Sequence, residues 1–367
     1  MVLGAIAGGL GPRVHNVVLS RGYRDSPGFE KYADLSVFRY PNPAPESWKD
    51  YATGTRHVSF AAKICVAGLD VLCSLLPLRR LTREADLIHV HFPLPLGLSA
   101  LAVRMLASRP LVVTVHGNAD VYELPRALAP ITRLVLRQAD AVVSVSEDLA
   151  AHLASQLGVK RVLVIPNGID ADQFRPARAS TETITLLSLS RLVPRKNVPV
   201  LIEAVGQLVQ EGETRLVLLV AGTGPESEKI EQLAQARPGF VRFLGFVDEE
   251  RKRALLAEAD VFVQLSTREG LSIATLEALA SGLPCIVSDR PGVREPITPG
   301  RNGWYVDDPE SVESVVSALR RLLRERDTLD EMKRSARAIA KERYSLRRMC
   351  EDYWTVFTDV LERGGRA

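Results

Sequence analysis

Short apolar runs rich in β-branched residues recur along this chain, and a turn and a segment with helical periodicity separate each run from the next. Several runs are continuous rather than alternating, as expected of parallel strands that helices cover on both faces. This alternation of strand and helix predicts a doubly wound α/β fold. We expect strands at residues 87–91, 111–116, 141–145, 162–166, 183–188, 215–221, 241–244, 261–265 and 284–288.

The alternating pattern restarts after residues 175–180, a polar stretch that contains a proline. A chain of 367 residues is also longer than one hydrophobic core usually supports. We therefore predict two Rossmann-like domains, residues 1–175 and 176–345. Long helices follow Pro309, and we expect the last one, over residues 346–367, to present an apolar stripe.

Composition narrows the classes of function. The net charge of +3 is too small to favour a nucleic-acid partner. The four cysteines show neither a C-x-x-C pair nor histidines at zinc-binding spacing, so we expect free thiols in a reducing compartment. The first residues lack the basic segment of a secretory signal, which favours a cytoplasmic location.

The most apolar stretch, residues 60–78, carries Lys63 and Asp70, and we therefore expect no transmembrane helix there. A basic segment with Arg79, Arg80 and Arg83 follows it. We expect a helix that packs against its own domain. The alternative is a helix that lies on the inner face of a membrane as a peripheral contact.

Two glutamates stand out in the otherwise apolar segment 266–284. Glu269 follows a buried strand in a loop with Gly270, and Glu277 lies on the helix that comes next. Ligands of open α/β sheets bind outside the carboxyl ends of the strands, where a helix N-terminus offers N–H donors to phosphate or sugar oxygens. Carboxylates accept hydrogen bonds from vicinal hydroxyls, so the pair predicts a site for a hydroxyl-rich ligand. The alternative is two solvated glutamates on a surface helix.

A basic loop within residues 187–198 follows the first predicted strand of the second domain. Arg191 and Lys196 are expected to project from it toward the cleft between the domains. Two fixed cations there would stabilise the negative charge that develops on a leaving diphosphate. A solvated basic loop is the alternative, and it is a serious rival for Arg195.

Two glycine runs are weaker signals. Residues 220–226 include Gly222 and permit close backbone approach after a strand, but the third glycine of a dinucleotide fingerprint is absent. Gly8 and Gly9 are predicted as a loop whose N–H groups face a phosphate, although a glycine run near a terminus is more often a turn. The segments expected next are a helix at 13–20 and a strand at 35–40.

Three histidines lie at the ends of neighbouring predicted strands. His89 and His91 end one strand and His116 ends the next. A lone histidine is usually structural, but three at adjacent strand ends favour a function. His116, which a glycine follows, is the best candidate to contact a ligand.

One acidic motif is interpreted as structural. Asp170 and Asp172 spell D-x-D, a metal–diphosphate motif in another architecture. No other acidic cluster lies near them in the sequence. We interpret the motif as a helix-capping turn and expect no required metal.

Taken together, these segments resemble glycosyltransferase family 4, whose members are retaining enzymes of the GT-B fold. The resemblance runs over almost the whole chain, and the Glu–seven residues–Glu motif at Glu269 and Glu277 is its most specific part. It implies two Rossmann-like domains that face each other across a cleft, with the C-terminal helix crossing back onto the first domain. The matching segments include HVHFPLPLG (89–97), VIPNGID (164–170), SRLVPRKN (190–197), LVAGTGPE (219–226), FLGFVDEE (243–250) and EADVFVQLSTREGLSIATLEALASGLPCIVSD (258–289).

The resemblance also implies roles for the two domains and their charged residues. The first domain would bind the acceptor, and the second would bind a UDP- or GDP-linked sugar. Glu269 would contact a hydroxyl of the donor sugar, and Glu277 would hold the ribose hydroxyls. Arg191 and Lys196 would bind the diphosphate, and His116 would touch the sugar.

Backbone groups would complete the donor site. The segment around Phe246 and Val247 would frame the base, and the N–H groups from Leu271 to Ile273 would face the sugar and phosphate. The commonest family form after the first glutamate is Gly-Phe-Gly, whereas this chain has Gly270, Leu271 and Ser272. We expect this departure to affect which sugar is bound.

We therefore expect a retaining, metal-independent hexosyl transfer to a glycan, a lipid-linked acceptor or a small molecule, without a cofactor, in carbohydrate biosynthesis. One alternative is a sugar-nucleotide epimerase or hydrolase of the same fold. Another is a catalytically silent carbohydrate-binding scaffold, which the four charged site residues argue against. A nicotinamide oxidoreductase is the weakest, because neither glycine run completes the fingerprint.

Overall fold

A computed structural model describes residues 2–23, 26–32, 35–45, 59–117, 121–122, 124–179 and 182–364. The chain divides into two compact units. Unit 1 comprises Met1–Gly168 and Leu346–Ala367, and unit 2 comprises Ile169–Ser345. The division falls before the boundary expected at residue 175, because the expected linker is hydrogen-bonded within unit 2: Ala177 N–H donates to Ser281 O at 2.7 Å. Residue 180 of that linker lies outside the described residues.

Unit 2 is built on a parallel sheet of six strands in the order β10-β9-β8-β11-β12-β13. In chain order within the unit this is 3-2-1-4-5-6, the order of a Rossmann fold, and the connections reverse direction between β8 and β11. The strands predicted in this unit are confirmed, and β13 is an additional one. Their bounds are β8 (Ile184–Leu189), β9 (Leu216–Ala221), β10 (Val241–Phe243), β11 (Val261–Gln264), β12 (Cys285–Ser288) and β13 (Gly303–Val306).

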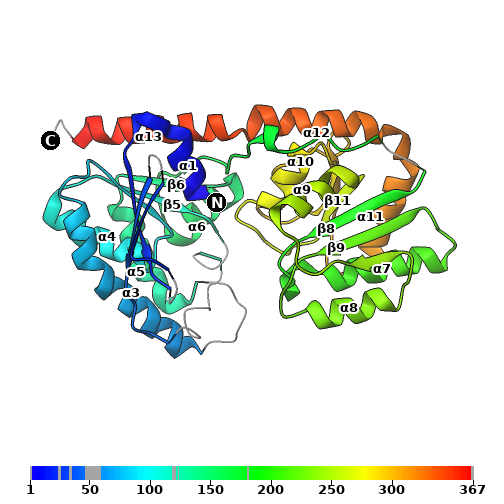
Figure 1. The fold of residues 1–367 in the computed structure, drawn as a ribbon, viewed down its shortest axis with the longest axis horizontal. Helices are drawn as coiled ribbons and strands as arrows, with labels where there is room; N and C mark the ends of the chain where they lie inside the picture. Colours follow the sequence, from blue (N-terminus) through cyan, green and yellow to red (C-terminus); the bar gives the residue numbers. More distant parts are fainter. Residues whose placement is uncertain are drawn as a thin grey trace. The chain divides into compact units, whose positions relative to one another are not determined.

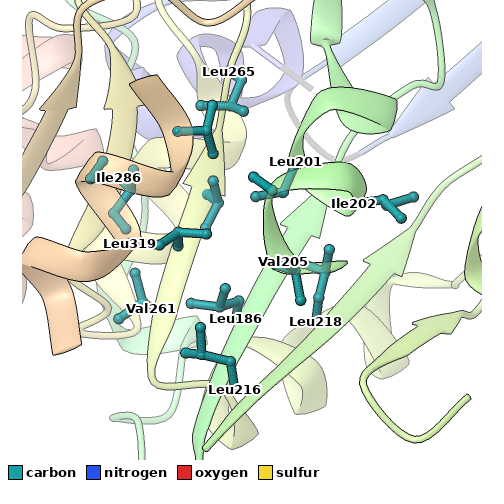
Figure 2. Close-up of a cluster of buried hydrophobic side chains, with 14 of the residues drawn as sticks. Leu186, Leu201, Ile202, Val205, Leu216, Leu218, Val261, Leu265, Ile286 and Leu319 are labelled. Carbon is teal, nitrogen blue, oxygen red and sulfur yellow. The ribbon is translucent and has the colours of Figure 1, made fainter. Parts of the chain in front are cut away.

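Helices cover both faces of this sheet (Figure 1). Helices α7 (Val198–Gln210), α8 (Ser227–Gln235) and α11 (Val312–Arg324) pack together on one side. On the other side lie α9 (Glu249–Glu258) and α10 (Ile273–Ala280), and α10 packs against α12 (Leu329–Arg343). Figure 2 shows how Leu201 and Val205 of α7 meet strand residues such as Leu186 and Leu218 in the core. Burial of these continuous apolar strands is what drives the layered arrangement.

The four strands predicted between residues 87 and 166 are confirmed, and they form a parallel sheet of unit 1 in the order β4-β5-β6-β7. One cluster of its buried side chains joins this sheet to the two ends of the chain: Ile6 and Leu10 of α1 and Tyr353 and Phe357 of α13 meet Val112 of β5. The apolar stripe predicted on the last helix is therefore part of the unit 1 core. The bounds are β4 (Ile88–His91), β5 (Leu111–Val115), β6 (Ala141–Ser144), β7 (Leu163–Val164), α1 (Val2–Leu10), α4 (Leu96–Ala107), α5 (Ala129–Gln138), α6 (Glu147–Leu157) and α13 (Leu346–Gly364).

The start of unit 1 differs from the prediction in two places. The helix expected at 13–20 is wrong: β1 (Asn16–Arg21) pairs in parallel with β3 (Leu35–Tyr40), and β2 (Phe29–Tyr32) pairs with β3 in antiparallel. The β-branched Val17 and Val18 suit a pleated strand better than a helix. The strand expected at 35–40 is confirmed.

The loop expected at Gly8 and Gly9 is also wrong, because both residues lie inside α1. The described chain has no strand before them, so the strand-to-helix loop of the pattern does not form. Gly9 instead permits close packing between helices: a Cβ at this position would lie 2.3 Å from Sγ of Cys350 on α13. Nothing lies within 4 Å of a Cβ placed at Gly8.

Helix α3 (Phe60–Leu81) packs one face on unit 1. Its segment Ala61–Leu81 is long and apolar enough to cross a membrane by length and composition alone, a test that core helices of soluble proteins also pass. The expectation that this helix does not span a membrane therefore stays a prediction. Asp70 is buried and accepts hydrogen bonds from Arg21 Nε at 2.8 Å, Tyr40 Oη at 3.0 Å and Asn42 Nδ2 at 2.7 Å. A carboxylate with these partners fixes this face of α3 to its own unit, as predicted.

Candidate functional site

The loops that follow β8 and β11 meet at the point where the strand order of unit 2 reverses. Asn197 ties them together: its φ is +52°, and its Nδ2 donates to Leu265 O at 3.0 Å. The Thr267 N–H donates to Arg195 O at 2.9 Å across the same pair of loops. In open α/β sheets this position is where ligands bind.

Glu269 and Lys196 come from these two loops and are in direct contact. Lys196 Nζ donates to Glu269 Oε1 at 2.5 Å, and Arg195 Nη1 donates to the same oxygen at 3.1 Å. Burial raises the pKa of Glu269, but the charges of Lys196 and Arg195 outweigh this effect and hold the pKa below its usual value. A solvated basic loop was the serious alternative for Arg195. Its hydrogen bond shows that Arg195 contacts the Glu269 carboxylate.

A polar network supports Glu269 from the end of β11. Gln264 Oε1 accepts hydrogen bonds from Ser272 Oγ at 2.6 Å and Thr275 Oγ1 at 3.0 Å, and its Nε2 donates to Ser266 Oγ at 3.1 Å. Ser272 also caps α10, because its Oγ accepts from Thr275 N–H at 3.2 Å. The serine that departs from the family form thus turns its side chain into the protein.

Arg191 is the second predicted cation of the loop after β8. Its Nη2 is buried and has no hydrogen-bond partner among the described residues. Burial and the nearby charge of Arg195 lower the pKa of Arg191. A buried guanidinium nitrogen without a partner is costly, and an anionic ligand would supply one.

Gly222 brings the loop after β9 against the loop after β8. Its φ is +132°, and a Cβ there would lie 1.8 Å from Ser190 O, so no other residue fits. Next along this edge of the sheet, after β10, come Phe246, which is 77% exposed, and the half-buried Val247. Both remain predicted contacts of the base.

The last segment of the predicted site runs from Gly270 to Glu277. Leu271 is buried and Ile273 begins α10, so the N–H groups predicted to bind phosphate lie at a helix N-terminus. Glu277 lies in the second turn of α10 and is 4% exposed. Burial raises the pKa of Glu277, although the hydrogen bond and the charge of the neighbouring Lys252 act to lower it.

The three histidines lie in unit 1 and pack side by side, with the ring centroids of His89 and His91 4.3 Å apart. His91 Nδ1 and His116 Nε2 share a hydrogen bond of 2.9 Å, and their rings are stacked. His89 bonds Thr114 Oγ1 at 2.8 Å and packs against Tyr353 of α13, so its surroundings are those of a core residue. Burial lowers the pKa of His89 to about 3 and that of His116 to about 4, and it lowers that of His91 as well. The imidazoles are therefore neutral near pH 7.

The acidic motif is a turn, as predicted. Asp170 caps a short 3₁₀ helix, and its Oδ1 accepts from Asp172 N–H at 3.2 Å. Asp172 pairs with Lys341 at 2.9 Å. No group of three or more His, Cys, Asp or Glu side chains in the described ranges is arranged to hold a metal ion.

Sequence reasoning missed Gln264 and Lys252. A signal existed for Gln264, the single polar residue in the strand VFVQ. Lys252 gave none, because it stands in the charged run DEERKR, where a solvated helix face is the ordinary expectation. Its Nζ nevertheless lies 2.6 Å from Glu277 Oε1.

Comparisons with known proteins fit this geometry. The model of "Glycosyltransferase Family 4" matches residues 6–173, and that of "Glycosyl transferases group 1" matches residues 170–339. A GDP-mannose-dependent alpha-(1-6)-phosphatidylinositol monomannoside mannosyltransferase of Mycobacterium tuberculosis is 33% identical over 75% of this chain and 76% of its own. An N-acetyl-alpha-D-glucosaminyl L-malate synthase of Bacillus anthracis is 27% identical over 75% of each chain.

Solved structures share the fold. A sucrose-phosphate synthase of Thermosynechococcus elongatus matches with a TM-score of 0.81 at 18% identity, covering 98% of this chain and 93% of that one. Anabaena HepE in complex with UDP matches with a TM-score of 0.72 at 16% identity, covering 94% and 100%. The chain therefore belongs to glycosyltransferase family 4: it has the GT-B fold and is a hexosyltransferase that uses a nucleotide-linked sugar.

Proposed function

We propose that unit 2 binds a nucleoside-diphosphate hexose at the reversal point between β8 and β11, and that Glu269 and Glu277 divide its recognition. Glu269 accepts a hydrogen bond from a hydroxyl of the sugar, and Glu277 holds the ribose. The observation that carries the proposal is the 2.5 Å contact between Lys196 and Glu269, which puts a cation whose side chain is 12% exposed and a buried carboxylate on the two loops at this point. A diphosphate sugar needs both kinds of group side by side.

The reaction proposed is a displacement with retention. The bond from the anomeric carbon to the diphosphate oxygen breaks, and the bond to the acceptor oxygen forms on the same face of the sugar. The acceptor proton passes to the leaving diphosphate, whose growing charge Arg191 and Lys196 stabilise. Glu269 is a poor proton donor here, because its pKa is held low by Lys196 and Arg195.

The relatives indicate which donor to test first. The mycobacterial relative that is 33% identical is named for GDP-mannose and a phosphatidylinositol mannoside. We propose GDP-mannose as the first donor and a lipid-linked acceptor bound by unit 1. UDP-linked sugars are the next candidates, because HepE was solved with UDP and with UDP-glucose.

A thermal-shift screen with GDP, UDP and ADP and their sugars tests the donor site. A nucleotide at 100 times its Kd should add about 2.7 kcal/mol of stability, and we expect a large shift from one base. Glu277→Ala should abolish that shift. The matched control is Glu203→Ala, which removes an exposed carboxylate of α7. This variant should show the same thermal shift as the unchanged protein. A full shift in Glu277→Ala, or no shift with any nucleotide in the intact protein, would contradict the proposal.

We further propose that α3 lies on the cytoplasmic face of a membrane. The face of α3 opposite Asp70 exposes an apolar stripe at helical spacing, including Cys65, Gly68, Leu72 and Leu76, with Leu72 67% and Leu76 58% exposed. Exposed Arg79, Arg80 and Arg83 follow at its end. An apolar face beside basic side chains is typical of helices that lie in the interface of anionic membranes. A lipid-linked acceptor would be found there.

Sedimentation with vesicles tests this contact. The protein should pellet with phosphatidylglycerol vesicles more than with phosphatidylcholine vesicles, and less at high salt. Leu72→Glu with Leu76→Glu should abolish pelleting. Leu134→Glu changes a leucine of α5 that is 49% exposed, and this control should pellet normally. If the double variant pellets like the unchanged protein, α3 is not the contact.

A further inference from the structure

Lys252 is a buried lysine beside the glutamate that is proposed to hold the ribose. It lies on α9, is 7% exposed, and its Nζ donates to Glu277 Oε1 at 2.6 Å. The same Nζ donates to Glu249 Oε1 at 3.0 Å and lies 2.9 Å from its Oε2. Lysines are rarely this buried, and those that are have charged partners.

The hydrogen-bonding capacity of this group is limited. An ammonium has three protons: Glu277 takes one, and the two oxygens of Glu249, whose side chain is 63% exposed, share a second. Oε1 of Glu277 is occupied by Lys252, and its Oε2 accepts no hydrogen bond from the described residues. The pair therefore offers Glu277 Oε2 as an acceptor and the remaining ammonium proton of Lys252 as a donor.

We propose that Lys252 and Glu277 bind the two vicinal hydroxyls of the nucleoside ribose as a pair. One hydroxyl donates to Glu277 Oε2, and the other accepts the third proton of the Lys252 ammonium. This inference rests on the proposed role of Glu277. It makes Lys252 a binding residue for the donor, in addition to Arg191 and Lys196.

The charges of the pair suit this role. Burial alone would favour a protonated, neutral Glu277, and it raises the pKa of this carboxyl. Burial opposes the charge of Lys252 too, but hydrogen bonds to Glu277 and Glu249 outweigh it and raise the pKa of the ammonium. The charge of Lys252 and its hydrogen bond act against burial and lower the pKa of Glu277 relative to a site without the lysine. A lysine that merely joined α9 to α10 would support the fold without distinguishing one ribose hydroxyl from another.

Deoxynucleotides separate these two roles. We would measure Kd values of GDP and UDP and of their 2′-deoxy and 3′-deoxy forms by calorimetry. The unchanged protein should bind each deoxy form about 10-fold or more weakly, the usual loss when a charged group loses its hydroxyl partner. In Lys252→Met the discrimination against one deoxy form should disappear, and that against the other should remain. Lys252→Gln keeps an N–H donor, so it should retain part of the discrimination that Lys252→Met loses.

The control is Lys333→Met. Lys333 is another lysine of unit 2 with 7% exposure, and it pairs with Asp260 at 2.9 Å. Its loss should lower stability without changing either discrimination. If Lys252→Met and Lys252→Gln both discriminate against the deoxy forms as the unchanged protein does, Lys252 is structural and the inference is wrong. If Glu277→Ala binds every nucleotide normally, the proposed function itself is wrong, whatever Lys252 does. A melting curve for each variant identifies those that do not fold. If Lys252→Met does not fold, the Kd values of Lys252→Gln provide the test.

Discussion

At the scale of single residues, Lys196 is expected to matter more than its neighbour Arg195. Both contact Glu269 Oε1, but the side chain of Lys196 is 12% exposed and that of Arg195 is 33% exposed, so solvent screens Arg195 more. We expect Lys196→Ala to lower kcat by about 10²–10³-fold, the effect of losing one fixed charge-stabilising donor. Arg195→Ala serves as the control and should lower kcat less. Equal losses in steady-state assays would contradict this order.

The same substitution should change the pH dependence. Lys196 and Arg195 hold the pKa of Glu269 below its usual value, so the carboxylate persists to low pH. Without Lys196 the pKa rises, and the charged form is then lost at a higher pH as the pH falls. The acid limb of kcat/KM should therefore move to higher pH in Lys196→Ala. A limb that stays in place would show that Glu269 does not need its charge.

The histidines of unit 1 should make stability fall in mild acid. His89 and His116 have folded-state pKa values of about 3 and about 4, below the ordinary value of 6.5. At pH values between the folded-state and the ordinary pKa, the unfolded chain therefore binds more protons than the folded chain. The free energy of unfolding should decrease as pH falls from about 6.5 toward 4. His89→Gln should flatten this slope. Urea titrations from pH 8 to 4 measure it, and the pH 8 value isolates the loss of packing. An unchanged slope would mean that His89 does not titrate as expected.

Site residues were predictable where a charged residue follows an expected strand directly in the sequence. Glu269 and Lys196 were inferred from loops after two strands, and the structure puts them in contact. Lys252 was not, because its burial depends on how α9 lies beside α10, and a charged run carries no sign of it. Roles that depend on a ligand, such as that of Glu277, stay predictions.

At the scale of elements, the strands of unit 2 were predictable because they are continuous apolar runs in a regular βα order. The start of unit 1 was not. Residues 13–20 have apolar positions compatible with a helix, but pairing with β3 decides in favour of strand β1. Gly8 and Gly9 match a loop motif only when a strand precedes them, and tertiary contacts with α13 place them in a helix instead.

Helix α1 offers a matched pair of glycines to test its packing. An added Cβ at Gly9 would lie 2.3 Å from Cys350 Sγ, whereas one at Gly8 meets nothing within 4 Å. Gly9→Ala should destabilise the protein by about 1–3 kcal/mol through overpacking. Gly8→Ala, the control, should stabilise it by up to about 1 kcal/mol, because alanine favours the helix. Thermal melts check both.

Relief of the contact provides a second check on α1. Cys350→Ala removes the sulfur that an alanine at position 9 would meet. Combined with Gly9→Ala, it should recover part of the loss, since contacting residues are not additive. A double variant as unstable as the sum of the single ones would argue that α1 does not pack on α13 at this point.

At the scale of the whole molecule, each unit carries its own buried cluster. Leu186, Val205 and Leu319 belong to that of unit 2, and Val112 and Phe357 to one of unit 1. The chain leaves unit 1 after Gly168 and returns to it at Leu346. Two clusters of this kind allow the units to unfold in separate steps, which is usual for chains of two domains.

Calorimetric unfolding should therefore resolve two transitions that respond to different changes. Phe357 of α13 is 8% exposed in the unit 1 cluster, so Phe357→Ala should cost about 3–5 kcal/mol and lower one transition. A bound nucleoside diphosphate should raise the other, because the proposed donor site lies within unit 2. The exposed Glu362, on the same helix, supplies the control Glu362→Ala, which should move neither. If Phe357→Ala lowered both transitions equally and the nucleotide raised both, the two units would unfold as one and not as separate bodies.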